Sequence, residues 1–155
     1  MTTAFDVLST ALRTGVAPGL RGMGFVGSGQ SFELRDPEVW RLLGIQKSSF
    51  NSASQVEFTL NLLSGRKIDW EQAREAHAYL PVRPNASTVY APATGVRTVR
   101  IGRLMPERRD HWWEVGASTS PAKLAADVLS AVKEFALPAL LQGFPDDWHV
   151  TPQAR

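Results

Sequence analysis

Two neighbouring stretches of the chain combine the apolar pattern of strands with polar side chains that could bind an anion. Gln46 and Asn61 belong to predicted strands joined by the polar segment 48–54, so a hairpin would bring them to the same end of a sheet. Arg100 would aim a planar fork of N–H donors at the same place if its strand lies beside them. The cluster could then bind a carboxylate or a phosphate. Its members are Gln46, Lys47, Ser48, Asn51, Asn61 and Arg100.

These residues also have a purely structural interpretation. Gln46 and Asn61 would then hydrogen-bond to backbone groups at strand edges, and Arg100 would pair with Glu57 or another carboxylate. The two interpretations differ in the face of the sheet on which Arg100 lies, and the sequence leaves both open.

A pair of tryptophans, Trp112 and Trp113, is a second candidate binding feature. Adjacent residues of a strand point to opposite faces, so one indole is expected in the core and the other against the opposite layer or in solvent. An exposed indole beside an arginine-rich strand could stack on a base or anchor a protein partner. Alternatively, it covers the sheet beneath a helix.

Positive charge is concentrated in one part of the chain. The net charge is +2, yet residues 83–109 contain a local excess of +5, because only Glu107 opposes their arginines. The arginines are Arg83, Arg97, Arg100, Arg103, Arg108 and Arg109. Such a band could face nucleic acid or an acidic protein surface, or it could be an ordinary solvated face.

Several other kinds of chemistry lack their residues or spacing. The absence of cysteine excludes disulfides and thiolate metal sites. His77, His111 and His149 lack the paired spacing of metal ligands. Segment 22–27 spells G-x-G-x-x-G but follows a helix instead of opening one, and 45–48 lacks the glycines of a phosphate loop. We therefore predict no metal, no cofactor and no catalytic residue, and favour a non-enzymatic protein.

The apolar pattern predicts helices near both ends of the chain. The first begins after Thr3, whose hydroxyl forms a capping box with Asp6, and is kinked or broken at Pro18. The last begins after the N-cap Ser120 and is stopped by Gly143. The residues expected on their buried faces are Phe5, Leu8, Leu12 and Val16 in the first helix and Leu124, Val128, Val132, Phe135 and Ala139 in the last.

Strand patterns fill most of the chain between these helices. They cover 31–35, 39–47, 56–62, 96–104 and 111–115, and the last two are expected to pair across a turn at 106–110. A short helix over 69–78, capped at Asp69, precedes a long irregular segment, 79–95. We predict an α+β fold: an antiparallel sheet of about five or six strands with the N- and C-terminal helices packed on one face. It forms a single domain, 1–143, with a tail over 144–155.

A dispersed pattern of residues runs from residue 5 to about 141. It comprises a proline-interrupted first helix ending in Gly24-Phe25, then Phe32, Ile45-Gln46-Lys47-Ser48, Phe50-Asn51, Phe58-Thr59-Leu60-Asn61, Arg100-Ile101-Gly102, Leu104, Trp112-Trp113 and Leu137-Pro138. In order and spacing it resembles a bacterial family known as domain of unknown function 4304. The resemblance implies no activity, substrate or catalytic residue. Segment 64–95 looks specific to this chain.

Three functions remain as hypotheses. The leading one is a non-enzymatic bacterial protein-interaction module, such as an inhibitor or an immunity-type partner. The alternative is a domain, possibly enzymatic, that binds a small phosphate or carboxylate in a concave pocket at the 48–54 turn. The third is nucleic-acid binding through residues 97–109. The opening residues lack the basic leader of a signal peptide and no apolar run reaches about 20 residues, so we expect a cytoplasmic protein.

Overall fold

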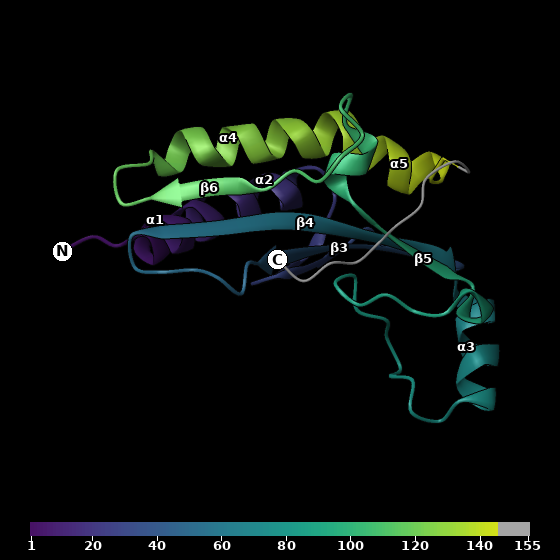
Figure 1. Ribbon diagram of the computed structural model, residues 1–155. Helices are drawn as coiled ribbons and strands as arrows, with labels where there is room; N and C mark the ends of the chain where they lie inside the picture. Colours follow the sequence, from purple (N-terminus) through teal and green to yellow (C-terminus); the bar gives the residue numbers. More distant parts are fainter. Residues whose placement is uncertain (146–155) are drawn as a thin grey trace.

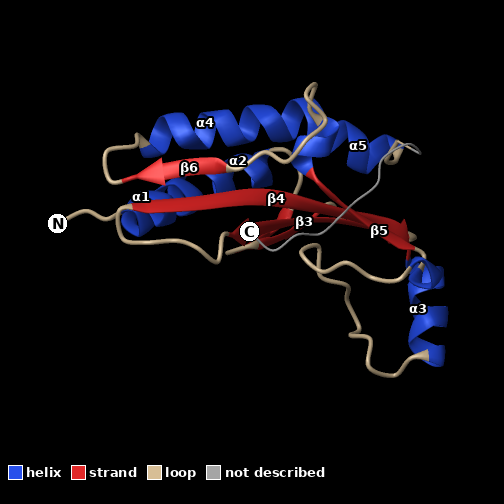
Figure 2. Ribbon diagram, in the orientation of Figure 1, coloured by secondary structure: helices blue, strands red, loops and turns tan. Residues whose placement is uncertain are grey.

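An antiparallel sheet forms the centre of the molecule (Figure 1). The computed structural model describes residues 1–145, whose strands form one sheet in the order β1-β2-β3-β4-β5, with β6 also paired to β4. The strands are β1 (Val26–Ser28), β2 (Ser31–Glu33), β3 (Val39–Lys47), β4 (Gln55–Arg66), β5 (Val96–Arg100) and β6 (Trp113–Gly116). Helices lie near both ends of this part of the chain (Figure 2). The predicted α+β class is confirmed.

Strand β4 organises the sheet because it is long enough to pair with two short strands along one edge. Residues 61–65 pair with β5 and residues 55–58 pair with β6, while β3 occupies the other edge. The predicted pairing of 111–115 with 96–104 is therefore wrong. Strand β5 ends at Arg100, and the chain continues as a 3-10 turn, η3 (Ile101–Leu104). Gly102 permits this change, since a Cβ there would overlap the backbone of Arg109 and His111.

Two long helical segments cover one face of the sheet. The first comprises α1 (Ala4–Ala11), a π-helical turn η1 (Leu12–Val16) and α2 (Ala17–Gly22). The second comprises α4 (Pro121–Ala131), the π-helical turn η4 (Val132–Ala136) and α5 (Leu137–Gln142). They bury the main core against the apolar face of β4, whose core residues are Val56, Phe58, Leu60 and Leu62.

Pro18 and Pro138, which lie inside these helical segments, each follow a π turn, whereas Pro121 is the first residue of α4. Proline lacks an N–H, and its ring clashes with the carbonyl four residues earlier in a regular α-helix. The wider turn before Pro18 and Pro138 moves that carbonyl away from the ring. Of the two predicted outcomes at Pro18, a kink or a break, the break is absent: the π turn distorts the helix before the proline, and helical structure continues to Gly22.

The N-terminal helix starts as predicted, but its buried face is different. The Asp6 backbone N–H donates to the Thr3 hydroxyl, and the backbone N–H of Thr3 donates to the Asp6 carboxylate. This last bond holds the pKa of Asp6 below its ordinary range. Phe5 is 43% exposed, against expectation. Ala4 is buried beside it, because the helix packs closely and turns small side chains inward. The buried residues of α1 are Ala4, Val7, Leu8 and Ala11.

The contact between the two long helical segments at Gly15 gives a test of this packing. A Cβ on Gly15 would overlap the Cβ of Ala125. We expect Gly15→Ala to lower the free energy of unfolding by about 1–3 kcal/mol through overpacking, although alanine favours helix by about 1 kcal/mol over glycine.

Gly22→Ala is the matched control, since nothing lies within 4 Å of a Cβ built at Gly22, the last residue of α2. Denaturant unfolding measures both variants. A Gly15→Ala protein as stable as Gly22→Ala would show that the helices do not meet at Gly15.

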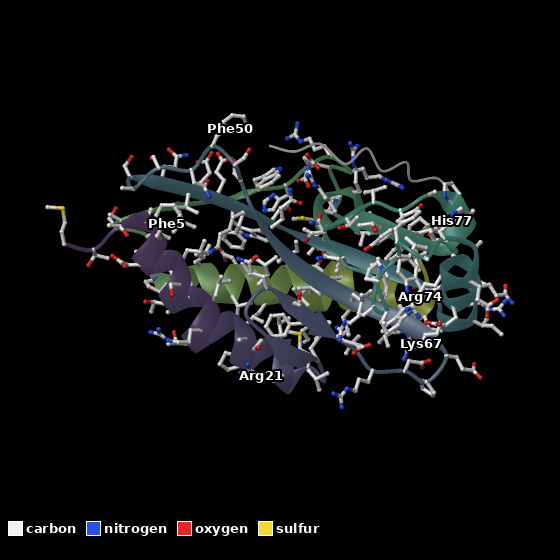
Figure 3. All side chains as sticks on the ribbon, turned by 90° about the horizontal axis from the view of Figure 1, so that it is seen from below. Phe5, Arg21, Phe50, Lys67, Arg74 and His77 are labelled. Atoms are coloured by element: carbon white, nitrogen blue, oxygen red, sulfur yellow. The ribbon has the colours of Figure 1, made fainter. Side chains whose placement is uncertain are left out.

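The opposite face of the sheet has a smaller second core. Helix α3 (Lys67–Ala76) follows β4 directly, and a 3-10 turn, η2 (Pro92–Thr94), precedes β5. Helix α3 lies at one end of the molecule, where Lys67, Arg74 and His77 project, while Phe5 and Phe50 lie towards the other end (Figure 3). The second core consists of Leu42, Leu63, Trp70, Ala73, Leu80, Ala86 and Val96.

Two predictions concern this second layer. The predicted start of the helix at Asp69 is wrong: it begins at Lys67, and Arg66 at the N-cap makes no side-chain capping bond. Packing of Trp70 fixes the helix instead. The irregular segment 79–95 covers the sheet, with Leu80, Pro84 and Ala86 buried.

In the described residues, no helix is long and apolar enough to cross a membrane.

The end of the described chain touches the domain. Phe144 is buried in the main core, immediately after Gly143 ends α5 with a φ of 102°. The predicted tail over 144–155 lies mostly outside the described residues, as does His149, so the domain boundary stays a prediction.

Candidate functional site

The second face of the sheet brings part of the predicted polar cluster together. Gln46, Asn61 and Arg100 share this face because β3, β4 and β5 pair in a register that places Asn61 opposite Arg100. The Asn61 amide donates to Gln46 Oε1 over 2.7 Å and to the Ser87 hydroxyl over 3.1 Å. Asn61 is buried. This amide therefore ties segment 79–95 to the sheet.

Arg100 is bound within the protein. Its Nη1 donates to Asp110 Oδ2 over 2.9 Å, and its guanidinium lies 5.0 Å from the centre of the Trp112 ring. Its side chain is 6% exposed, against 37% for Asp110. The structural interpretation of Arg100 thus describes the observed geometry, with Asp110 as the carboxylate in place of Glu57.

The remaining polar candidates lie elsewhere. Lys47 alternates with Gln46 along β3 and so points to the opposite face. Ser48 accepts from the Phe50 backbone N–H over 3.2 Å, and Asn51 Oδ1 accepts from the Glu57 backbone N–H over 2.9 Å. Both side chains therefore shape the turn between β3 and β4.

A pocket of about 310 Å³ does lie at the 48–54 turn, where the sequence predicts one. Ser48, Asn51 and Glu57 are among its lining residues, while Gln46, Asn61 and Arg100 are not. Its only charged lining residue is the carboxylate Glu57, so this pocket does not suit an anion.

The two tryptophans lie on different faces, as predicted. Trp113 stacks on Phe58 with 5.4 Å between ring centres, and His111 meets it edge-on at 4.6 Å. Trp112 lies beneath Arg100 on the second face. The indoles are only 8% and 9% exposed, so neither is the exposed anchor that one interpretation required. Packing against Phe58 and Arg100 accounts for their burial.

A groove of about 530 Å³ lies between β6 and the last helical segment. Three carboxylates line it: Glu114 on β6, Asp127 on α4 and Glu134 on η4. No lysine or arginine of residues 1–145 lines it. The aromatic and apolar lining residues are His111, Trp112, Trp113, Phe135, Met105 and Ala131. We call this site the acidic groove.

Sequence reasoning missed the acidic groove, although part of its signal is local. Asp127 and Glu134 are separated by two helical turns and therefore share a helix face with Ser130 between them. Glu114 could not be placed beside them, because its strand was expected to pair with β5.

Most arginines of the predicted basic band form ion pairs or hydrogen bonds within the chain. Arg83 pairs with Glu33 at 3.2 Å, and Arg100 pairs with Asp110. Arg97 and Arg103 donate to the carbonyl oxygens of Pro145 and Arg108. These four arginines therefore stabilise loops and strand ends, which is a structural use of their charge.

Fold and site together define an α+β domain with a two-helix cover on one face of its sheet and an acidic groove at one sheet edge. The chain belongs to the family described as Domain of unknown function (DUF4304), whose model matches residues 16–142. This confirms the resemblance inferred from the sequence. No curated protein and no solved structure matches the chain. The site must therefore be interpreted from its own chemistry.

Proposed function

We propose that this protein is an interaction module that binds an extended, basic segment of a partner protein in the acidic groove. The observation that carries the proposal is the convergence of Glu114, Asp127 and Glu134 on an aromatic surface beside a strand edge. An inhibitor or immunity-type role is the form of such binding that we favour.

Charge favours a basic partner. The chain as a whole has a net charge of +2, whereas Glu114, Asp127 and Glu134 line the groove and no lysine or arginine of residues 1–145 does. Complementary charge of this kind accelerates association and rejects acidic partners. The rings of His111 and Phe135 also line the groove, and aromatic faces attract guanidinium and ammonium groups.

The edge of β6 offers backbone groups to an extended chain. In residues 1–145, β4 is the only strand that pairs with β6. An unpaired strand edge is a template for an added strand, and alternate side chains of that strand provide specificity. Glu114 lies directly across from Glu57 in the β4–β6 pair. A basic residue in line with these two carboxylates would offset their repulsion, whereas an acidic one would increase it.

A defined peptide tests the proposal. A short fluorescent peptide that alternates arginine and valine should bind the wild-type protein, as measured by fluorescence anisotropy, and bind more weakly as salt is raised. A peptide with glutamate in place of arginine should not bind. Replacing Asp127 by Asn and Glu134 by Gln together should weaken binding about tenfold, roughly 1.4 kcal/mol.

Glu75→Gln is the control, because Glu75 is an exposed helical carboxylate on α3, outside the groove. Equal binding of the acidic peptide, or unchanged affinity in the double variant, would overturn the proposal.

A further inference from the structure

A second pocket lies on the helix-covered side of the sheet, between the N-terminal helix, the β1–β2 turn and the end of β3. Its volume is about 350 Å³. Three basic side chains line it: Arg13, Arg21 and Lys47. Ser9 and Ser28 add hydroxyl groups, and Leu12 and Ala17 add apolar surface. It shares no lining residue with the acidic groove. We call it the basic pocket.

We propose that the basic pocket binds a small phosphate monoester. Within the described part of the chain, no aspartate or glutamate lines it. Across residues 1–145, none of its three basic groups lies within 4.0 Å of a carboxylate, whereas Arg41, Arg66, Arg74, Arg83 and Arg100 each do. Three positive charges converge without an acidic neighbour, and a phosphate monoester, with a charge of about −1.5 to −2 at pH 7, matches them better than a singly charged carboxylate.

The π turn explains how two arginines of one helix reach the same pocket. In an uninterrupted α-helix, at about 100° per residue, Arg13 and Arg21 would lie roughly 80° apart around the axis. The extra residue that a π turn adds to the helix reduces this angle to roughly 20°. Turn η1 begins one residue before Arg13 and ends at Val16, so most of it lies between the two positions. The device that accommodates Pro18 therefore also aligns the two guanidinium groups.

Arg21 is held in place for such a role. Its Nε and Nη2 donate to the Gly27 carbonyl over 3.3 and 3.0 Å, which leaves the Nη1 donors for a ligand. The side chain projects from the N-terminal helix (Figure 3). Gly27 has a φ of 135°, a conformation that favours glycine, and this brings its carbonyl to the helix.

The size and lining of the pocket indicate more than a bare phosphate. Its volume is within the range of small-molecule sites, and inorganic phosphate would fill only part of it. Leu12 and Ala17 provide apolar surface beside the basic groups. The organic part of the monoester is therefore expected to be small and at least partly apolar, such as a single ring.

Phenyl phosphate is a suitable probe, with benzenesulfonate as a singly charged compound that has the same ring. Isothermal titration calorimetry should show saturable binding of phenyl phosphate to the full chain and weaker binding of both benzenesulfonate and inorganic phosphate. Arg21→Gln and Arg13→Gln should each lower the affinity for phenyl phosphate at least about tenfold. Arg13→Lys, which keeps the charge, should retain most of the affinity.

Lys133→Gln is a matched control. Lys133 is an exposed basic residue at the second position of η4, as Arg13 is at the second position of η1, and it lies outside the pocket. The affinity of the Lys133→Gln variant for phenyl phosphate should equal that of wild type. Gly29 lines the pocket, and the NMR signal of its backbone amide should shift on titration with phenyl phosphate.

Absence of saturable binding to wild type, or equal affinity in Arg13→Gln, Arg21→Gln and Lys133→Gln, would overturn the site. Equal affinity for benzenesulfonate would overturn the recognition of a dianion, and equal affinity for inorganic phosphate would overturn the organic part of the ligand. None of these results bears on peptide binding in the acidic groove.

Discussion

Trp70→Ala is expected to lower the free energy of unfolding by about 3–5 kcal/mol, the usual cost of truncating a large buried aromatic residue. Trp70 is fully buried at the centre of the second core. Its ring meets Tyr90 edge-on at 4.9 Å, and its Nε1 donates to the carbonyl oxygens of Pro81 and Val82, each over 3.2 Å. One side chain thus joins α3 to segment 79–95.

The loss should be concentrated in this layer. Without the indole, the carbonyl groups of Pro81 and Val82 lose their donor and the segment loses its main apolar contact. Limited chymotrypsin digestion should then cleave after Tyr90, which is on this segment and packs against Trp70, faster than in wild type. Denaturant unfolding measures the change in stability.

Ile68→Ala is the control from the same helix, because Ile68 is 55% exposed, and a surface substitution is expected to change stability by no more than about 0.5 kcal/mol. If Trp70→Ala were no more costly than Ile68→Ala, segment 79–95 would be held by other contacts.

Local patterns predicted the elements whose apolar and polar side chains recur at a regular spacing. Strand β3 has the predicted bounds, 39–47, because apolar side chains on both of its faces meet a core: Leu43 and Ile45 on one side and Leu42 on the other. The buried face of β4 follows from strict alternation of apolar residues. The pairing register, which the sequence left open for Arg100, places Gln46, Asn61 and Arg100 on one face.

Errors arose where a distant contact overrides a local signal. The turn residues at 106–110 are typical of a hairpin, yet β6 pairs with β4, and the Thr59 hydroxyl donates to the His111 carbonyl over 2.6 Å where β5 has ended. Asp69 resembles an N-cap, but α3 begins earlier because Trp70 must reach the second core. Neither contact is visible in the local sequence.

The candidate sites show the same limit. The sequence left the face of Arg100 open, and the use of its side chain depends on Asp110, which approaches only through the turn that Gly102 permits. Lys47 was assigned to an anion site, and it lines a pocket whose other basic groups lie on the N-terminal helix. The spacing of Arg13 and Arg21 alone does not reveal this, because a regular α-helix would separate them.

Arg100→Ala is expected to lower the free energy of unfolding by about 2–4 kcal/mol. Removing one partner from a fully buried ion pair costs about 3–5 kcal/mol. The cost is smaller here because Asp110, which is 37% exposed, regains water, but packing of the arginine side chain on Trp112 is also lost. Arg97→Ala, at an exposed arginine on the same strand, should cost less, about 1 kcal/mol, because it loses the hydrogen bond to the Pro145 carbonyl.

Two further variants separate charge from packing. Arg100→Met keeps an unbranched side chain over Trp112 and should recover part of the loss. Adding Asp110→Asn to Arg100→Met removes the unpaired carboxylate and should recover more. If Arg100→Ala were as stable as Arg97→Ala, the ion pair would not stabilise the fold.

The Arg100→Met variant also shows whether Arg100 stabilises the fold or binds a ligand. Because the Arg100 guanidinium is held by Asp110 and Trp112, phenyl phosphate should raise the Tm of wild type and of Arg100→Met by the same amount. Arg13→Gln should reduce that shift, since Arg13 lines the basic pocket and Arg100 does not. A shift lost in Arg100→Met but kept in Arg13→Gln would move the anion site to the second face of the sheet, where Arg100, Asn61 and Gln46 meet.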